Sequence, residues 1–430
     1  MGKGHKKSNK SKSKTTNFKQ QNRQNEKKRQ QETRQKQGLK PCDEGEINLK
    51  FHAFDTWFFR ESRPHDAAGA SELSSLFPPP IRTLAGALRT YIGDAMGIDW
   101  KTLHCENSDF DFEKSLGNAE HLGELALNGA WIVYNGQRLY PAPLYLMQKD
   151  KDTGKGKYIK RLQAGKSVRC DLGFVRLPEM PKDCIGYKGM EKYWVNTAGL
   201  RACLDGNVPA ENQLIAIDDL FSHEPRLGIA RDNEKRAVIK GQLYQTQHIR
   251  LKDDVHIEVQ AKNVGADVLA VLSTEQQPAV LRFGGEGRMA GVEACGEVEQ
   301  LPFTQVKKST FTLHFITPAD FNGQMFPDAF KTTEREGQTI WHGELNGVRF
   351  SIEAAVIGKA HREGGWDMQK HQPRAVKSYI PAGSTWFCRL DNTEDYPQLD
   401  EALHGQCIGM DSAYGRGQIL IGQWSDTDNQ

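Results

Sequence analysis

The sequence predicts an α+β fold, on three observations. Short segments that alternate apolar and polar residues, the pattern of half-buried strands, recur along the chain. Helical spacing of apolar residues is rare, and strands and helices do not alternate regularly, which argues against a doubly wound sheet. The 41 Gly and 18 Pro indicate many turns, and 430 residues with 37% hydrophobic content suit two or three domains.

The N-terminal half contains the clearest elements. Residues 47–55 alternate apolar and polar side chains and predict the first strand. After a run of prolines, two leucines and a tyrosine spaced by four and three predict a helix over 83–92. A strand at 131–134 is followed by Asn135-Gly136, a dipeptide typical of hairpin turns, so the chain is expected to turn back there.

The pattern restarts in the second half of the chain. Alternation predicts further strands, whereas residues 221–229 are interpreted as a loop. The predicted strands are 240–251, 255–259, 311–317 and 348–352.

A basic tail precedes these elements. Residues 1–40 hold 14 Lys or Arg and two Glu, a net charge of +12, which leaves −10 for the other 390 residues because the whole chain carries +2. The tail is too polar to bury a core, so we expect residues 1–44 to be disordered. Such an arm suits contact with a polyanion or a solubilising role. A nucleic-acid site on the acidic body requires a local basic patch.

The compartment is indicated by cysteines and hydropathy. The eight cysteines are scattered and contain no Cys-x-x-Cys pair, which favours free thiols in a reducing cytosol over zinc or disulfide frameworks. No apolar stretch is long enough to span a bilayer, and the N-terminus lacks the apolar segment of a secretory signal. We therefore expect a soluble, cytoplasmic protein without membrane contact.

Basic residues gather beside glycines at three places. Glycines beside arginines let guanidinium groups and backbone N–H groups reach phosphates, so their recurrence favours a nucleic-acid ligand. The charged insertion 148–169 holds eight basic and two acidic side chains, and two glycine loops follow later in the chain. The residues concerned are Lys155, Lys157, Lys160 and Arg161 in the insertion, Gly284, Gly285, Gly287 and Arg288 in the first loop, and Gly415, Arg416 and Gly417 in the second.

Signatures of catalysis and nucleotide binding fail when their spacing is checked. The segment 164–167 resembles the end of a phosphate-binding loop, but the required first glycine is Lys160. Residues 285–290 fit a G-x-G-x-x-A pattern, but a poor helix follows. The dipeptide His65-Asp66 lies in a loop without further metal ligands. We expect no cofactor and no metal site.

Ordered blocks of residues resemble a known family. They are Phe54–Pro64, Phe77–Thr90, Glu224–Ile229, Gly241–Tyr244, Phe283–Arg288, Thr317–Phe321, Gly365–Asp367, Ile380–Ser384 and Gly415–Trp424. In number and order, over residues 46–424, they resemble the Cmr-type RAMP family, the Cas-five-like subunit of type III-B CRISPR effector complexes. The basic tail lies outside the resemblance.

The resemblance implies two ferredoxin-like (RRM-like) domains, 45–210 and 211–430, with glycine-rich loops and insertions. It implies a non-catalytic subunit that binds the 5′ tag of CRISPR RNA and bridges the large polymerase-domain subunit to the backbone RAMP subunits. Target RNA would be met only indirectly. Besides the insertion and the first and second glycine loops, the expected RNA contacts are Arg60, Arg82 and Arg89.

Two alternatives stay open. The first is a metal-independent endoribonuclease that processes CRISPR RNA, with His65 or His371 as the general base. The second is a nucleotide-binding protein that uses the loop 284–291.

Overall fold

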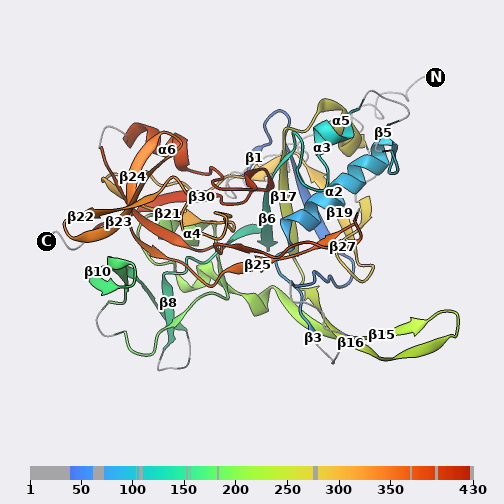
Figure 1. Ribbon diagram of the computed structural model, residues 1–430, viewed down its shortest axis with the longest axis horizontal. Helices are drawn as coiled ribbons and strands as arrows, with labels where there is room; N and C mark the ends of the chain where they lie inside the picture. The colour runs from blue at the N-terminus through green and yellow to red at the C-terminus, as the bar shows by residue number, and fades with distance from the viewer. Residues whose placement is uncertain are drawn as a thin grey trace, which may run out of the picture.

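Two antiparallel sheets lie side by side and form the body of the molecule (Figure 1). The computed structural model describes residues 39–61, 72–102, 104–105, 110–151, 154, 156–181, 184–274, 279–368, 370–392 and 396–426. Strands dominate and the helices are few, which confirms the α+β class. Among the described residues, no helix is both long and apolar enough to cross a membrane.

The first sheet has eight strands, in the order β14-β13-β7-β6-β17-β2-β19-β18. Its strands are β2 (Ile47–Ala53), β6 (Ala126–Tyr134), β7 (Gln137–Pro141), β13 (Tyr193–Asn196), β14 (Leu214–Ala216), β17 (Val255–Lys262), β18 (Ala279–Arg282) and β19 (Met289–Cys295). The predicted strand at 47–55 and the turn at Asn135-Gly136 are confirmed, since Tyr134 pairs with Gln137 across that dipeptide.

Two helices lie between strands of this sheet in the chain order. Helix α2 (Ile81–Met96) follows β2, and α5 (Ala266–Thr274) follows β17. Apart from the elements inserted between them, the chain therefore runs β2-α2-β6-β17-α5-β19 through four adjacent strands of the sheet. The helix predicted over 83–92 is confirmed, and it ends where Gly97 adopts a left-handed conformation with φ of 73°.

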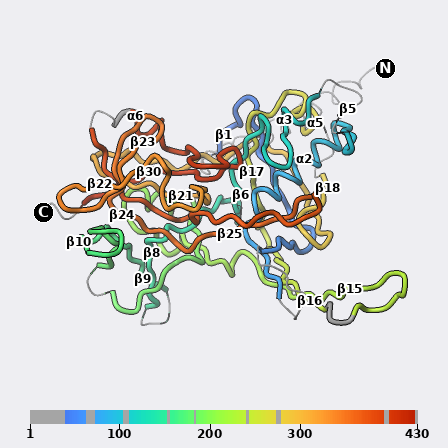
Figure 2. The backbone as a smooth tube through the Cα atoms, in the orientation of Figure 1, coloured from blue at the N-terminus to red at the C-terminus, as the bar shows by residue number. Residues whose placement is uncertain are grey.

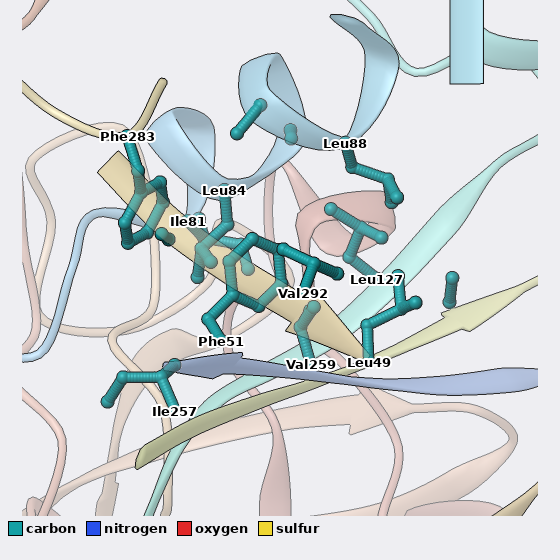
Figure 3. Close-up of a cluster of buried hydrophobic side chains, with 14 of the residues drawn as sticks. Leu49, Phe51, Ile81, Leu84, Leu88, Leu127, Ile257, Val259, Phe283 and Val292 are labelled. Carbon is teal, nitrogen blue, oxygen red and sulfur yellow. The ribbon is translucent and has the colours of Figure 1, made fainter. Parts of the chain in front are cut away.

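Helix α2 covers the apolar face of the sheet. Figure 3 shows Leu84 and Leu88 facing Phe51 and Val292 of the strands. These side chains are fully or almost fully buried, because residues three and four apart lie on the same side of the helix. This packing positions the C-terminal end of β2, and the residues that follow it belong to the site described below.

The second sheet has six strands, in the order β22-β23-β24-β29-β21-β30. They are β21 (Thr310–Phe315), β22 (Lys331–Arg335), β23 (Gln338–Leu345), β24 (Val348–Val356), β29 (Thr385–Leu390) and β30 (Ile419–Gln423), with α6 (Tyr396–Leu403) before β30. The strands predicted at 311–317 and 348–352 are confirmed. Its last four strands in this order, β24-β29-β21-β30, repeat the order in which β6, β17, β2 and β19 lie in the first sheet.

The change from one sheet to the other falls later than the sequence suggests. Strands β17, β18 and β19 all follow residue 211, yet they complete the first sheet. The expected boundary at 210/211 therefore lies inside that sheet, and the chain changes sheets between Cys295 and Thr310. Alternation identifies strands but does not show which sheet they join.

The two sheets share a buried layer. Helix α4 (Thr197–Leu204) supplies Leu200 and Leu204, which pack with Trp131 of the first sheet and with Phe387 and Leu420 of the second. The sheets are thus joined by apolar contact as well as by the chain.

The N-terminal end of the described chain is also ordered earlier than expected. Strand β1 (Leu39–Pro41) pairs with β20 (Glu297–Glu299), so the described structure begins at Leu39 rather than near Glu46. The rest of the basic tail, residues 1–38, lies outside the described residues.

A long hairpin extends from the body next to the first sheet (Figure 1). It consists of β15 (Phe221–Asp232) and β16 (Ala237–Leu251), and the short β3 (Glu72–Leu73) pairs with β16. The interpretation of residues 221–229 as a loop is wrong, because β15 contains them. Pro225 is tolerated there because β15 pairs only with β16 within the described chain, so its other edge needs no N–H donor.

The insertion forms short strands beside the second sheet. They are β8 (Leu146–Asp150), β9 (Lys157–Arg161) and β12 (Lys188–Gly189) in one small sheet, and β10 (Gln163–Cys170) and β11 (Gly173–Glu179) in another. Other short strands are β4 (Ile98–Asp99), β5 (His104–Cys105), β25 (His361–Glu363), β26 (Trp366–Asp367), β27 (Gln372–Pro373) and β28 (Lys377–Tyr379), and α3 (Phe112–Leu116) is the remaining helix.

A buried histidine in β21 makes stability depend on pH. His314 is hydrogen-bonded through both ring nitrogens, to Thr312 Oγ1 at 2.9 Å and to Thr385 Oγ1 at 3.1 Å. Burial lowers its pKa from 6.5 to about 3. Between these two pKa values, His314 is protonated in the unfolded chain and neutral in the folded chain. The free energy of unfolding therefore falls as the pH drops from 6.5 towards 3.

We expect His314→Asn to remove this dependence. Between about pH 7.5 and pH 5.5, the wild type should lose about 1.4 kcal/mol more than the variant, measured from urea midpoints. Equal losses in the two proteins would contradict a neutral His314 in the core.

Candidate nucleic-acid interface

Three arginines and two carboxylates meet where the β15–β16 hairpin joins the body. This arginine cluster consists of Asp55, Glu224, Arg226, Arg250 and Arg288. Asp55 accepts hydrogen bonds from Arg226 Nη2 at 3.0 Å, from Arg250 Nη2 at 2.8 Å and from Arg288 Nη1 at 3.2 Å. Glu224 accepts from the Nε atoms of Arg226 at 2.9 Å and Arg250 at 2.6 Å. The cluster carries a net charge of +1.

The strands place these side chains together. Glu224 and Arg226 are two residues apart on β15, so they project from the same face. Arg250 pairs with Ser222 across the hairpin, which brings it beside Glu224. Asp55 follows β2, and Arg288 ends the loop between β18 and β19. Four separate segments therefore contribute to one surface.

The guanidinium groups of the three arginines form hydrogen bonds with only some of their nitrogen atoms. The side chains of Arg226, Arg250 and Arg288 are 32%, 46% and 23% exposed. Within the described chain, no hydrogen bond involves Nη1 of Arg226, Nη1 of Arg250 or Nη2 of Arg288. These N–H groups are held in place by the carboxylates and remain available to phosphate oxygens.

The carboxylates of the cluster stay ionised. The hydrogen bond from Arg226 holds the pKa of Asp55 at about 2, and hydrogen bonds from Arg226 and Arg250 lower the pKa of Glu224. The charge of the cluster therefore does not change near neutral pH.

The first glycine loop borders the cluster. Gly284 has a φ of +85°, and a Cβ there would lie 2.6 Å from the carbonyl oxygen of Phe58. Gly285 N donates to the same carbonyl at 2.8 Å, which ties the loop to the segment after Asp55. A Cβ at Gly287 would meet no atom within 4 Å. Four predicted residues, Gly284, Gly285, Gly287 and Arg288, thus lie together on an exposed edge.

This loop does not have the structure of a dinucleotide site. Strand β19 begins at Met289, directly after Arg288, so the loop leads into a strand and not into the helix that a dinucleotide site requires. Similarly, residues 164–167 lie in β10 and form no phosphate-binding loop. Within the described ranges, no group of three His, Cys, Asp or Glu could hold a metal ion.

A buried histidine lies behind the cluster. His248 Nδ1 is 3.0 Å from Thr56 Oγ1, and its ring stacks on Phe58 with centroids 5.2 Å apart. Burial, followed by the charges of Arg226 and Arg288, lowers the pKa of His248. Its side chain is 1% exposed, so it supports the surface and does not reach a ligand on it.

Arg82 and Arg89 are engaged within the protein. Arg82 donates to Asp411 Oδ2 at 3.1 Å and lies over the Tyr414 ring. Arg89 donates to the carbonyls of Leu116 at 2.7 Å and His121 at 2.8 Å. Arg60 is exposed and follows Phe58 by two residues, close to the first glycine loop.

The basic residues of the insertion lie apart from the cluster. In Figure 1, β8 and β10 lie beside the second sheet, whereas the hairpin extends from the first. Lys157 Nζ is 3.0 Å from Asp150 Oδ1, and Arg161 donates to the carbonyl of Gly206. Lys160 is half-buried, and Lys155 lies outside the described residues.

The second glycine loop is internal. Arg416 is 2% exposed, forms a bidentate ion pair with Glu363 of β25, and lies 4.0 Å from the centre of the Tyr379 ring. Cβ atoms at Gly415 and Gly417 would lie 2.5 Å from Leu127 O and 2.0 Å from Ile408 O. The expected phosphate contact of this loop is therefore corrected: its glycines allow close packing, and its arginine pairs with Glu363 of β25. The β25 segment is labelled in Figure 2.

Sequence reasoning named one of the five cluster residues, Arg288, as a candidate site residue and missed the other four. Asp55, Glu224 and Arg226 stood in the family-like blocks, but their meeting depends on the register of the hairpin. Interpreting β15 as a loop concealed the two-residue spacing that places Glu224 and Arg226 on one face. In a strand, that two-residue spacing would have predicted that the two side chains lie side by side.

Comparisons with solved structures give distant likenesses. Chains of two cryo-EM structures of the type III-B Cmr-beta complex bound to cognate target RNA, one of them also with AMPPnP, match at 16% and 14% identity with a TM-score of 0.41, covering 79% of this chain and 86% of theirs. A chain in the crystal structure of the Csm3-Csm4 subcomplex of the type III-A interference complex matches at 12% identity and a TM-score of 0.35, covering 79% of this chain and 92% of that one. No curated protein matches.

A family model gives the assignment. The model described as CRISPR-associated protein (Cas_Cmr3) matches residues 49–424, nearly the whole span of the resemblance found in the sequence. This protein belongs to the CRISPR-associated Cmr3 family.

Proposed function

We propose that this protein is a non-catalytic RNA-binding subunit of a type III-B CRISPR effector complex, and that its arginine cluster binds the 5′ tag of the guide RNA. The proposal is supported above all by guanidinium N–H groups that have no hydrogen-bond acceptor within the described chain and that Asp55 and Glu224 hold at one exposed edge. The body outside the basic tail is acidic, so this local arrangement is what attracts a polyanion.

Single-stranded RNA suits the shape of the site. The first glycine loop presents exposed backbone next to Arg288, which lets a sugar-phosphate chain approach closely. Among the other predicted RNA contacts, Arg60 is exposed beside this loop. Lys157, Lys160 and Arg161 of the insertion are partly exposed and lie away from the cluster.

The two sheets are two ferredoxin-like units. Each contains four adjacent strands in the same order, and those of the first follow the βαββαβ succession of that fold once the inserted elements are set aside. In the second unit, the hairpin β22–β23 occupies the position in the chain order that α2 has in the first unit.

The protein bridges the large polymerase-domain subunit to the backbone RAMP subunits and meets target RNA only through them. The hairpin supplies a surface for such neighbours. Leu227, Ile229 and Leu243 are exposed, and the pairing of Ile229 with Leu243 places them on the face opposite Arg226.

A role in cleavage finds less support at this site. His248, which pairs with Glu224 across the hairpin, is buried, and His223, next to Glu224 in the chain, projects from the other face of β15. His371 lies at an exposed turn with φ of 50° in the separate β26–β27 segment. His65 lies outside the described residues.

We expect the purified complex to contain RNA with a uniform 5′ end, and the isolated chain to bind that end without cutting it. Incubation of labelled repeat RNA with the chain in EDTA, followed by gel electrophoresis, tests both points. Discrete cleavage that is lost on His371→Ala would favour the endoribonuclease instead. A chain that binds no tag RNA at low salt would refute the proposal.

A further inference from the structure

A carboxylate at the centre of a phosphate-binding surface needs an explanation. Asp55 touches all three arginines of the cluster and, together with Glu224, reduces its net charge from +3 to +1. It is 48% exposed, more than any of the arginines that it binds. A group that only positioned the guanidiniums would need no such access to solvent.

The two carboxylates differ in the hydrogen-bonding capacity that they keep. Each carboxylate oxygen has two lone pairs. On Glu224, Oε1 accepts from Nε and Nη2 of Arg226, and Oε2 faces Nε and Nη2 of Arg250, so both oxygens are filled.

Asp55 accepts from fewer side-chain donors than Glu224 does. Its Oδ2 accepts from Arg226 and Arg288, whereas Arg250 is the one side-chain donor to its Oδ1 among the described residues; the backbone N–H of Thr56 also helps to lower the pKa of this carboxyl. Asp55 therefore offers a hydrogen-bond acceptor directly beside the free guanidinium N–H groups.

We propose that Asp55 Oδ1 accepts a hydrogen bond from the ribose 2′-hydroxyl of the nucleotide whose phosphate lies on the arginines, so that the site selects RNA over DNA. This rests on the proposed function of the cluster. In a nucleotide, the 2′-hydroxyl and the 3′-phosphate are attached to neighbouring ring carbons, so a donor for Asp55 and an acceptor for the arginines arrive together. The 2′-hydroxyl is the group by which a protein distinguishes RNA from DNA at a given position.

The test uses three probes of one sequence: single-stranded RNA, the corresponding DNA, and RNA with 2′-O-methyl groups. The methyl group removes the donor and keeps an RNA-like sugar. Affinities of the full chain are measured by fluorescence anisotropy at one salt concentration. We expect the wild type to prefer RNA to each of the other two by about tenfold or more, the worth of one hydrogen bond to a charged group.

Asp55→Ala and Glu224→Ala form a matched pair of variants. Each removes one negative charge and hydrogen bonds that hold the arginines in place. Both effects act on the binding of phosphate, which all three probes contain, so they cancel in the ratio of the affinities. We expect the ratio of RNA to DNA affinity to fall towards one in Asp55→Ala and to stay at the wild-type value in Glu224→Ala.

The outcomes separate the two proposals. If the wild type binds none of the probes, the proposed function is refuted and this inference with it. If the wild type binds RNA and 2′-O-methyl RNA equally, or if Asp55→Ala keeps the wild-type ratio, the inference alone is refuted. An equal fall in both variants would assign the selection to the cluster as a whole and overturn the role of Asp55.

Discussion

Replacing Arg250 and Arg288 together by alanine is expected to weaken binding of a short tag RNA by about a hundredfold, since each charge-assisted hydrogen bond contributes about 1.5 kcal/mol. Both side chains present free N–H groups at the exposed edge. Their loss also changes the cluster from a net charge of +1 to −1, so that Asp55 and Glu224 repel the RNA.

Arg349→Ala is the control for this double variant. Arg349 lies on β24 in the second sheet, and its side chain is 70% exposed and 3.9 Å from Glu344. Its loss removes a surface charge without touching the cluster, so RNA affinity should change little. Equal effects of the control and the double variant would show that general charge, and not the cluster, attracts the RNA.

The second large effect is on stability and not on RNA. Arg416→Ala removes the bidentate arginine partner of the buried Glu363 and leaves it only His361, at 2.9 Å, among the described ion-pair partners; breaking such a buried pair costs about 3–5 kcal/mol. The pKa of Glu363 is held at about 2 by its environment, in which burial is opposed by His361 and Arg416. Urea unfolding should show the loss, while the folded variant should bind tag RNA as the wild type does.

A paired replacement separates the causes. Arg416→Met with Glu363→Leu removes both charges and keeps the packing volume, so it should restore most of the stability that Arg416→Ala loses. Weakened RNA binding by a folded Arg416→Ala variant would contradict the internal role of the second glycine loop.

The local structure of this protein follows from its sequence to a useful extent. The strand at 47–55, the turn at Asn135-Gly136 and the helix around Leu84 and Leu88 are set by neighbouring residues, and all three are found. Residues 221–229 were misjudged because strand pairing with β16 overrides the local preference of Pro225.

The candidate site depends on contacts that local patterns do not contain. Asp55 and Arg288 are 233 positions apart, and they meet only because β19 pairs with β2 in the first sheet. The sequence indicated that arginines beside glycines bind phosphate; the Arg288 side chain is partly exposed, whereas Arg416 is buried. What separates the two is burial opposite an acid, Glu363, and that follows from tertiary packing.

The most direct test of the central claim, that the arginine cluster contacts RNA phosphates, is the salt dependence of tag RNA affinity in the wild type and in the Arg250→Ala, Arg288→Ala variant. Each phosphate contact to a single strand contributes about −0.7 to the slope of log affinity against log salt, so the variant should have a slope shallower by about 1.4. Parallel lines for the two proteins would contradict the claim.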